Sequence, residues 1–384
     1  MIPPFSFATA GRIRFGNGAL SQMGDDVAGL GTRILIVTDA GLLATGIVDR
    51  ALAVLGTEGR QVAVFSEVVA DPPEAIIHRA TEAAITQKAT GIIGLGGGSS
   101  LDVAKLVAVL ARKEEKLADI YGVGNVTGGR LPLMLVPTTA GTGSEVTPIS
   151  IVTTGAKEKM GVVSPVLLPD VALLDPELTR DLPAHITAAT GVDAMVHAIE
   201  AFASASPNNN PISRQLAVAA LRLMGGALER AVHEADEAAR ADMLLGSMLA
   251  GQAFANSPVA AVHALAYPIG GHFGVPHGLS NALVLPHVLR FNAETEPDAY
   301  AALLPHAFPD APRTESHTDA ALFADLLADL SARCGLQQTL REVGIGKGDL
   351  PALARDAMNQ TRLLINNPRP VTEADAVRIY SAAF

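Results

Sequence analysis

The first half of the chain alternates short apolar runs with segments of helical periodicity. The apolar runs predict buried strands, and the segments between them predict helices at about 43–55, 73–88 and 100–112. Alternation of strand and helix indicates a mostly parallel sheet with right-handed crossovers. The predicted strands are Arg33–Thr38, Gln61–Phe65, Gly91–Leu95 and Leu133–Val136, with further short strands near Ile149–Val152, Met160–Val163 and Val171–Leu174.

The pattern changes beyond about Pro183. Long stretches rich in alanine and leucine, such as Pro211–Val232 and Ala238–Phe254, have helical periodicity and predict an all-helical domain. We therefore expect two domains, an α/β domain over 1–180 and an all-helical domain over 181–384. There is no internal repeat or low-complexity linker, so the cleft between the domains is the expected ligand site.

Composition excludes several classes of protein. Of the 384 residues, 49% are hydrophobic and 17% are charged, which indicates large buried cores and argues against disorder. A single cysteine, Cys334, excludes an intrachain disulfide and a thiolate cluster, and it suits the reducing cytoplasm. The N-terminal residues lack a basic region followed by an apolar run, and no run of about 18 apolar residues occurs, so we expect neither a signal peptide nor a membrane span. The net charge of −11 disfavours nucleic acid or an anionic membrane as a partner.

Potential metal ligands occur in two short segments of the second half. The first segment, GVDAMVHAIEAF (Gly191–Phe202), carries Asp193 and His197 four residues apart in a helical pattern, and so on one face. A carboxylate and an imidazole beside an apolar stripe are costly to bury unless they bind something. Taken alone, such a pair is more often a surface or capping pair than a metal site.

The second segment, VHALAYPIGGHFGVPHG (Val262–Gly278), supplies His263 and His277. The prolines and glycines between them exclude a single helix, and a turn there brings a helical histidine and one at the next helix start to a common point. One carboxylate and three imidazoles suit a divalent transition metal such as iron or zinc. Together, the two segments favour a metal site over a purely structural role.

A first glycine-rich loop, GLGGGSS (Gly94–Ser100), follows a predicted strand and opens a predicted helix. Backbone N–H groups at such a helix start attract a phosphate. The loop lacks the spacing of a P-loop, and Ser99 stands where a dinucleotide fingerprint has its third glycine. A tight strand-to-helix turn is the structural alternative, so this loop alone favours phosphate binding only slightly.

A second loop, PTTAGTGSEVT (Pro137–Thr147), follows the next strand and is rich in hydroxyl groups and glycines. Two such loops after neighbouring parallel strands indicate a binding site for a dinucleotide. Asp39 ends the first strand, where a carboxylate accepts a hydrogen bond from a ribose hydroxyl and repels an added phosphate. Capping of a helix explains Asp39 equally well.

Several motifs in fixed order resemble those of the iron-containing (group III, metal-dependent) alcohol dehydrogenases, and in particular a lactaldehyde reductase-like branch. The resemblance runs nearly from end to end of the chain. Besides the two ligand segments, the motifs are GGGSSLDVAK (Gly96–Lys105), PTTAGTGSEVT (Pro137–Thr147), KMGVVSPVLLPDVALLDPEL (Lys159–Leu178) and NNPRPVTEADAVRIY (Asn366–Tyr380).

The resemblance implies a dehydroquinate synthase-like architecture, with an N-terminal NAD-binding domain and a helical metal-binding domain. It implies one divalent metal, with iron expected and zinc as the alternative, and NAD preferred over NADP. It also implies a homodimer, with the strand Gly11–Phe15 near the partner. The implied metal ligands are Asp193, His197, His263 and His277. The implied cofactor-binding residues are Asp39, Gly96, Gly97, Gly98, Ser99, Asp102, Thr138, Thr139, Thr142, Ser144 and Lys159.

One position departs from the resemblance. Similar lactaldehyde reductases often carry a histidine four residues after the third ligand, where this chain has Tyr267. A histidine relays protons at neutral pH, whereas tyrosine has an ordinary pKa near 10. Tyr267 and His272 are therefore candidates for a catalytic role, with pocket shaping and a hydrogen-bonded loop position as their alternatives. Glu200 lies on the Asp193 face and is either a partner of a metal ligand or a surface residue.

The implied reaction is reversible hydride transfer between a primary or secondary alcohol, or a diol, and NAD, with the metal polarising the substrate oxygen. One alternative is a hydroxyacid–oxoacid transhydrogenase that retains its cofactor. Another is a dehydroquinate synthase-like lyase, which needs basic residues that the GVPHG segment lacks. The complete ligand set argues against a catalytically silent NAD-binding protein. Residues expected at the pocket are largely apolar and favour small or medium alcohols: Thr147, Ile149, Phe254, Val259, Tyr267 and Phe273.

Overall fold

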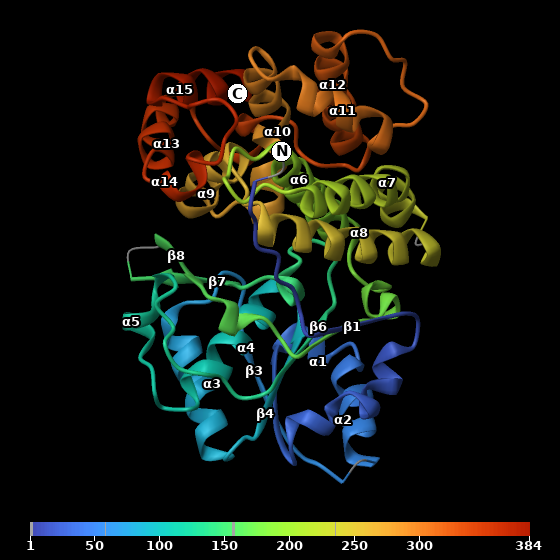
Figure 1. Ribbon diagram of the computed structural model, residues 1–384, viewed down its shortest axis with the longest axis vertical. Coiled ribbons are helices and arrows are strands. Elements are labelled where there is room, and N and C mark those ends of the chain that lie inside the picture. The colour runs from blue at the N-terminus through green and yellow to red at the C-terminus, as the bar shows by residue number, and fades with distance from the viewer. Residues whose placement is uncertain (1–2, 58, 156–157, 235) are drawn as a thin grey trace. The chain divides into compact units, whose positions relative to one another are not determined.

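The computed structural model describes residues 3–57, 59–155, 158–234 and 236–384. The chain divides into two compact units (Figure 1). One unit is Ala8–Asp181, and the other consists of the first few residues together with Leu182–Phe384.

The Ala8–Asp181 unit is built on a parallel sheet. Its central strands are buried because helices cover both faces, which is typical of parallel sheets. Among the described residues, the six strands pair in the order β1 (Arg12–Phe15), β9 (Val171–Leu174), β6 (Leu133–Pro137), β4 (Gly91–Gly96), β2 (Arg33–Asp39) and β3 (Gln61–Val68). The predicted alternation of strands and helices, and the parallel sheet that it implies, are confirmed.

Side chains of the central strands alternate between two hydrophobic clusters, as the two-residue period of a strand requires. Ile34 and Ile36 pack in the cluster that includes α2 (Ile47–Thr57). Leu35 and Val37 belong to the opposite cluster, which contains the buried faces of α3 (Glu74–Thr86) and α4 (Gly98–Leu110). Figure 1 shows α3 and α4 on one side of this sheet and α2 on the other.

The strand order reverses between β2 and β4. From β2 the chain continues to β3 on one side, whereas from β4 it continues to β6 on the other. In open α/β sheets, ligands bind at such a switch point, outside the carboxyl ends of the strands. Asp39 is the last residue of β2, and the first glycine-rich loop follows β4, so the topology brings both to this position.

Three local features differ from the simplest sequence pattern. The helix predicted at 43–55 begins later, as α2, and a shorter helix α1 (Ala40–Leu43) precedes it, with Gly46 at a positive φ of 76° between the two. A second, smaller sheet joins β5 (Gly122–Val123), β8 (Glu158–Val163) and β7 (Ile149–Thr154). At the sheet edge, β1 pairs in parallel with β9 of its own chain.

The other unit is helical, as predicted. Among the described residues, none of its helices is long and apolar enough to cross a membrane. The helices relevant to the site are α6 (Ala184–Ala203), α8 (Glu237–Asn256), α9 (Ala261–Phe273) and α10 (His277–Ala293). The others are α7 (Pro211–His233), α11 (Pro297–Ala307), α12 (Ser316–Arg333), α13 (Leu350–Ala357), α14 (Thr361–Leu364) and α15 (Glu373–Ala382).

Candidate active site

Helix α6 carries the first two predicted ligands. Asp193 and His197 are one helical turn apart and almost completely buried, with 2% and 5% exposure. The His197 ring stacks between the rings of Phe254 and His263, with centroid separations of 4.3 Å and 4.8 Å. This packing fixes the plane of His197 beside the other ligands.

The other two predicted ligands lie near the starts of neighbouring helices. His263 is close to the first residue of α9, and His277 is the first residue of α10. A Cβ atom on Gly278 would lie 2.3 Å from the carbonyl oxygen of Ala189 in α6. Only glycine therefore allows the start of α10 to approach α6 this closely, and this contact brings His277 beside Asp193.

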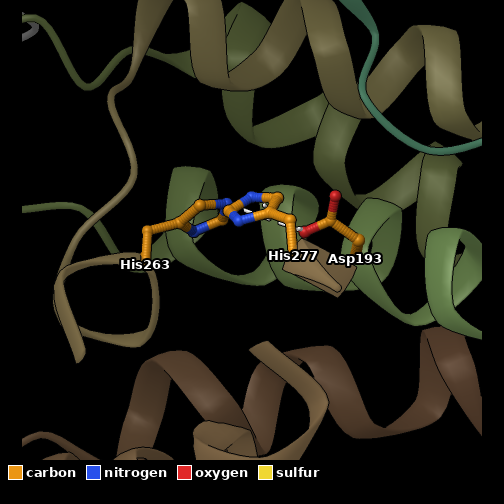
Figure 2. Close-up of side chains that lie close together, drawn as sticks. All are labelled: Asp193, His263 and His277. Carbon is orange, nitrogen blue, oxygen red and sulfur yellow. Dashed lines mark ion pairs between the residues drawn. The ribbon is translucent and has the colours of Figure 1, made fainter. Parts of the chain in front are cut away.

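Asp193, His263 and His277 converge on one point (Figure 2). Each offers a ligand atom, and these atoms all lie within 4.8 Å of one another. The Nε2 atoms of His263 and His277 are each 3.8 Å from Oδ1 of Asp193. A carboxylate oxygen and imidazole nitrogens at this spacing fit a divalent transition metal. His197, the fourth predicted ligand, stacks on the ring of His263 but is not one of the three residues whose ligand atoms converge.

The electrostatics of the site favour an ionised carboxylate. Burial alone would raise the pKa of Asp193, but attraction to His197, His277 and His263 and a hydrogen bond from Asn281 lower it overall. The carboxylate of Asp193 is therefore negatively charged although it is buried. A divalent cation compensates such a charge, which agrees with the chemistry of the donors.

Two further side chains contact the predicted ligands. Asn281 is buried, and its Nδ2 lies 2.5 Å from Oδ1 of Asp193 and 3.3 Å from Nε2 of both His263 and His277. Sequence reasoning missed Asn281, although it follows His277 by the same four residues that separate Asp193 from His197. Glu200 is 5% exposed and contacts Nδ1 of His263 at 2.7 Å, so the surface alternative for Glu200 is wrong.

Tyr267 and His272 lie in different environments on α9. The Tyr267 ring is 5.7 Å from the ring of His277, centroid to centroid, and therefore borders the ligand set. The His272 side chain is half exposed and forms an ion pair with Asp356, which lies in the last turn of α13. Tyr267 is thus close to the candidate metal centre, and His272 connects two helices.

The two glycine-rich loops of the Ala8–Asp181 unit are in contact. Gly97 caps α4 and Gly98 begins it. Cβ atoms on Gly98 and Gly97 would lie 2.6 Å and 3.6 Å from Cγ2 of Thr142 and Thr139 respectively. The N–H of Thr138 donates to the carbonyl of Gly96 at 2.9 Å. Together the loops form a backbone-rich surface at the start of α4, as a diphosphate requires.

Asp39 lies beside this surface. Its Oδ1 accepts from the N–H of Leu42 at 3.0 Å, so Asp39 caps α1. Its Oδ2 would be 3.4 Å from a Cβ atom on Gly96, which places the carboxylate against the first loop. Helix capping and a role in cofactor binding are therefore compatible for Asp39, because one carboxylate oxygen caps α1 and the other faces the loop.

The remaining predicted cofactor residues have different contacts. Asp102 accepts from Oγ of Ser144 at 2.6 Å and from the N–H of Ile151 at 2.9 Å, so it ties α4 to the second loop. Lys159 lies on the smaller sheet, where it forms an ion pair with Asp71 and donates to Oγ1 of Thr153 at 3.2 Å. Ser99 is in the first turn of α4.

Comparison with known proteins gives a consistent result. The model of iron-containing alcohol dehydrogenases matches residues 10–176, and that of the C-terminal part of the same family matches residues 187–384. The chain is 43% identical to long-chain-alcohol dehydrogenase 1 of Geobacillus thermodenitrificans, over 96% of this chain and 94% of that protein. It is 32% identical to the NAD-dependent methanol dehydrogenase of Bacillus methanolicus, over 100% of this chain and 98% of that protein.

A solved structure agrees over the same length. The crystal structure of a 1,3-propanediol oxidoreductase superposes with a TM-score of 0.95 at 34% identity, covering 99% of this chain and 100% of that one. Both halves of the chain, and with them the ligand helices and the glycine-rich loops, fall within these matches. The chain therefore belongs to the iron-containing alcohol dehydrogenase family and is an oxidoreductase that interconverts alcohols and aldehydes with NAD and an iron-type metal.

Proposed function

We propose that Asp193, His197, His263 and His277 together hold one divalent metal ion, with Fe(II) as the expected ion. The convergence of Asp193, His263 and His277 carries this proposal, since their ligand atoms lie within 4.8 Å of one another. His197 is proposed as the fourth ligand because it lies one helical turn after Asp193 on α6 and its ring packs against that of His263. When bound, the metal supplies a Lewis acid that polarises the oxygen of the alcohol or aldehyde.

The side chains around the ligands orient and shield the site. Phe254 stacks on His197 and covers one side of it with an apolar surface. Because Asp193 is kept ionised in a buried position, the ligand set remains preorganised for a cation. Tyr267 borders His277, where we expect it to shape the space for the substrate.

We propose that NAD binds at the carboxyl ends of β2, β4 and β6, with its diphosphate on the backbone of Gly96, Gly97, Gly98 and Ser99. NAD supplies the hydride acceptor, and the chain supplies its orientation. The start of α4 favours the negative charge of the diphosphate. The Oδ2 atom of Asp39, which faces the first loop, can accept a hydrogen bond from a ribose hydroxyl and repels a phosphate, so it favours NAD over NADP. Thr138, Thr139, Thr142, Ser144 and Lys159 are proposed to line the middle of the cofactor site.

The proposed substrates are primary or secondary alcohols and diols, or the corresponding aldehydes and ketones. The side chains that contact the rings of His197 and His277 include Phe254 and Tyr267, which present aromatic surface to the site. The relatives named above act on a long-chain alcohol, methanol and a propanediol according to their names. An uncharged hydroxyl compound is the chemistry common to all three.

We further propose that the enzyme is a cytoplasmic homodimer. Its single cysteine, Cys334, is buried and forms no disulfide, which is compatible with a reducing compartment. The edge strand β1 carries Phe15 with 39% exposure, which offers an apolar contact for a second copy. Light scattering coupled to size exclusion tests this assembly: a mass of one chain would contradict it.

Anaerobic metal reconstitution tests the proposed chemistry. The protein is stripped of metal and restored with Fe(II), Zn(II), Mn(II), Ni(II) or buffer alone. Absorbance of NADH and NADPH is then followed with a panel of short aldehydes, ketones and diols. We expect oxidation of NADH that depends on the metal, is fastest with Fe(II) and exceeds that of NADPH. Absence of turnover with every metal, despite NAD binding, would contradict the proposal and indicate a retained cofactor.

A further inference from the structure

Glu200 forms two buried contacts that connect α6 to the start of α9. Its Oε1 accepts from the N–H of Val262 at 2.7 Å, and its Oε2 contacts Nδ1 of His263 at 2.7 Å. The Glu200 and His263 side chains are only 5% and 3% exposed. Water therefore competes little with these two hydrogen bonds.

The contact defines where the His263 ring carries its proton. A carboxylate oxygen only accepts hydrogen bonds, so Nδ1 of His263 must donate its N–H to Glu200. In the neutral ring, Nε2 then keeps its lone pair, and this is the nitrogen that faces Asp193 at 3.8 Å. The lone pair is the form of imidazole nitrogen that a metal requires.

A neighbour on the opposite side of the ring leads to the same tautomer. Asn281 Nδ2 is 2.5 Å from the carboxylate oxygen of Asp193, and this end of the amide must be the NH2 group because the carboxylate accepts. The same NH2 group lies 3.3 Å from Nε2 of His263. A donor faces Nε2 and an acceptor faces Nδ1, so both neighbours select the same proton position.

Glu200 also completes the start of helix α9. The N-cap residue Ala260 provides no side-chain hydrogen bond, and the N–H groups of a first helical turn have no partner within the helix. Glu200 satisfies one of them, at Val262, and places negative charge at the positive end of the helix. One carboxylate thus holds both the helix that carries His263 and the ring itself.

We propose that Glu200 is a positioning residue of the metal centre, which fixes the tautomer and orientation of His263 so that Nε2 is available to the metal. This inference rests on the proposed metal site. The carboxylate also increases the electron density on His263, which strengthens its bond to a cation. Partners of this kind typically contribute about 10- to 100-fold to metal affinity.

The substitution Glu200→Gln separates the two functions of the side chain. A glutamine oxygen can still accept from Val262, but the amide NH2 then faces Nδ1 of His263. Because two donors cannot share one hydrogen bond, the ring must move its proton to Nε2 or turn away. The start of α9 is preserved in this variant, while the metal-binding form of His263 is disfavoured. Glu200→Asp keeps both acceptor oxygens but is one methylene shorter, so we expect an intermediate effect.

The test measures Zn(II) and Co(II) affinity by competition with a chromogenic chelator, together with the visible absorption of bound Co(II). The matched control is Glu229→Gln, which removes the same charge from an exposed pair with Arg333. We expect about 10- to 100-fold weaker binding and an altered Co(II) spectrum for Glu200→Gln, and wild-type values for the control. The unfolding midpoint of each protein in EDTA reports whether the fold is retained.

Each outcome bears on a separate claim. Wild-type affinity and spectrum in Glu200→Gln would overturn the role of Glu200 and leave the metal centre intact. If Glu200→Gln does not fold, Glu200→Asp decides, and unchanged affinity and spectrum there would also overturn the role. Failure of the wild-type protein to bind one metal ion per chain would instead contradict the proposed metal centre, and with it this inference.

Discussion

Gly98 and Thr142 are packed so closely that a Cβ atom on Gly98 would lie 2.6 Å from Cγ2 and 2.9 Å from Oγ1 of the threonine. The two residues belong to different glycine-rich loops, which follow the adjacent strands β4 and β6. This contact fixes the separation between the loops. The proposed site for the NAD diphosphate therefore depends on the absence of a side chain at residue 98.

Gly98→Ala is expected to weaken NADH binding by about tenfold, or about 1.4 kcal/mol, because the second loop must move to admit the methyl group. Fluorescence titration of NADH measures the change, and metal content is expected to stay constant. The double variant Gly98→Ala/Thr142→Ala removes the clashing atoms and should recover part of the affinity relative to Thr142→Ala alone. NADH affinity that is unchanged in Gly98→Ala would contradict the placement of the diphosphate.

Asp39→Gly is expected to narrow the preference for NAD over NADP by about tenfold, since a charge repulsion of about 1–2 kcal/mol is lost. Stability should change little, because glycine in place of an N-cap aspartate costs roughly a few tenths of a kcal/mol. Asp39→Asn is the matched variant: it keeps an oxygen for the Leu42 N–H and removes only the charge. The measurement is kcat/KM for both cofactors. A ratio that does not change in either variant would show that Asp39 is only a helix cap.

His277→Ala is expected to lose metal and to lower kcat by at least about 100-fold, because a Lewis acid contributes several kcal/mol to such a reaction. The fold should be retained, since the His277 side chain is 39% exposed and stands at the first position of α10. Metal per chain, turnover and far-UV circular dichroism are measured together. Unchanged turnover with unchanged metal content would exclude His277 from the ligand set.

His287 is expected to make stability depend on pH below neutrality. Burial, together with the nearby Arg290, lowers the pKa of His287 from 6.5 to about 4. Between these values the unfolded chain binds a proton that the folded chain does not, so stability falls as the pH falls from 6.5 to 4. The loss attributable to His287 is at most about 3 kcal/mol.

Urea unfolding of wild type and His287→Gln at several pH values isolates this contribution. The difference in unfolding free energy between the two proteins should shift in favour of the variant as the pH decreases from 6.5 to 4. Above pH 7 this difference in unfolding free energy should become constant, because His287 is then neutral in both the folded and the unfolded protein. A difference that is independent of pH would show that His287 titrates normally in the folded protein.

Local patterns predicted most elements because strands and helices bury side chains with different periods. The predicted strand Val171–Leu174 agrees with β9 at both ends, and the predicted helix at 73–88 corresponds to α3 within two residues. The glycines and prolines of the second ligand segment mark a break between helices, as expected. The break itself lies later than their positions imply, since α9 continues through Pro268, Gly270 and Gly271 to Phe273.

The sequence alone could not decide the positions of Glu200 and Asn281. The position of Glu200 along α6 is compatible with a surface glutamate and with a partner of a metal ligand. Only the packing of α9 against α6 buries its side chain. Asn281 resembles any asparagine in a helix until α10 approaches α6. In both cases, the deciding contact joins residues more than 60 positions apart. Helical periodicity carries no information over such a separation.

The sequence by itself determined the two structural classes, the order of the glycine-rich loops and the ligand types, because each depends on residues that are close in the chain. Tertiary structure decided how these parts meet. The approach of α10 to α6 at Gly278 places His277 beside Asp193, and the reversal of strand order between β2 and β4 places Asp39 beside Gly96. Such contacts depend on the packing of whole elements, so the shape of their neighbours, and not local pattern, fixes them.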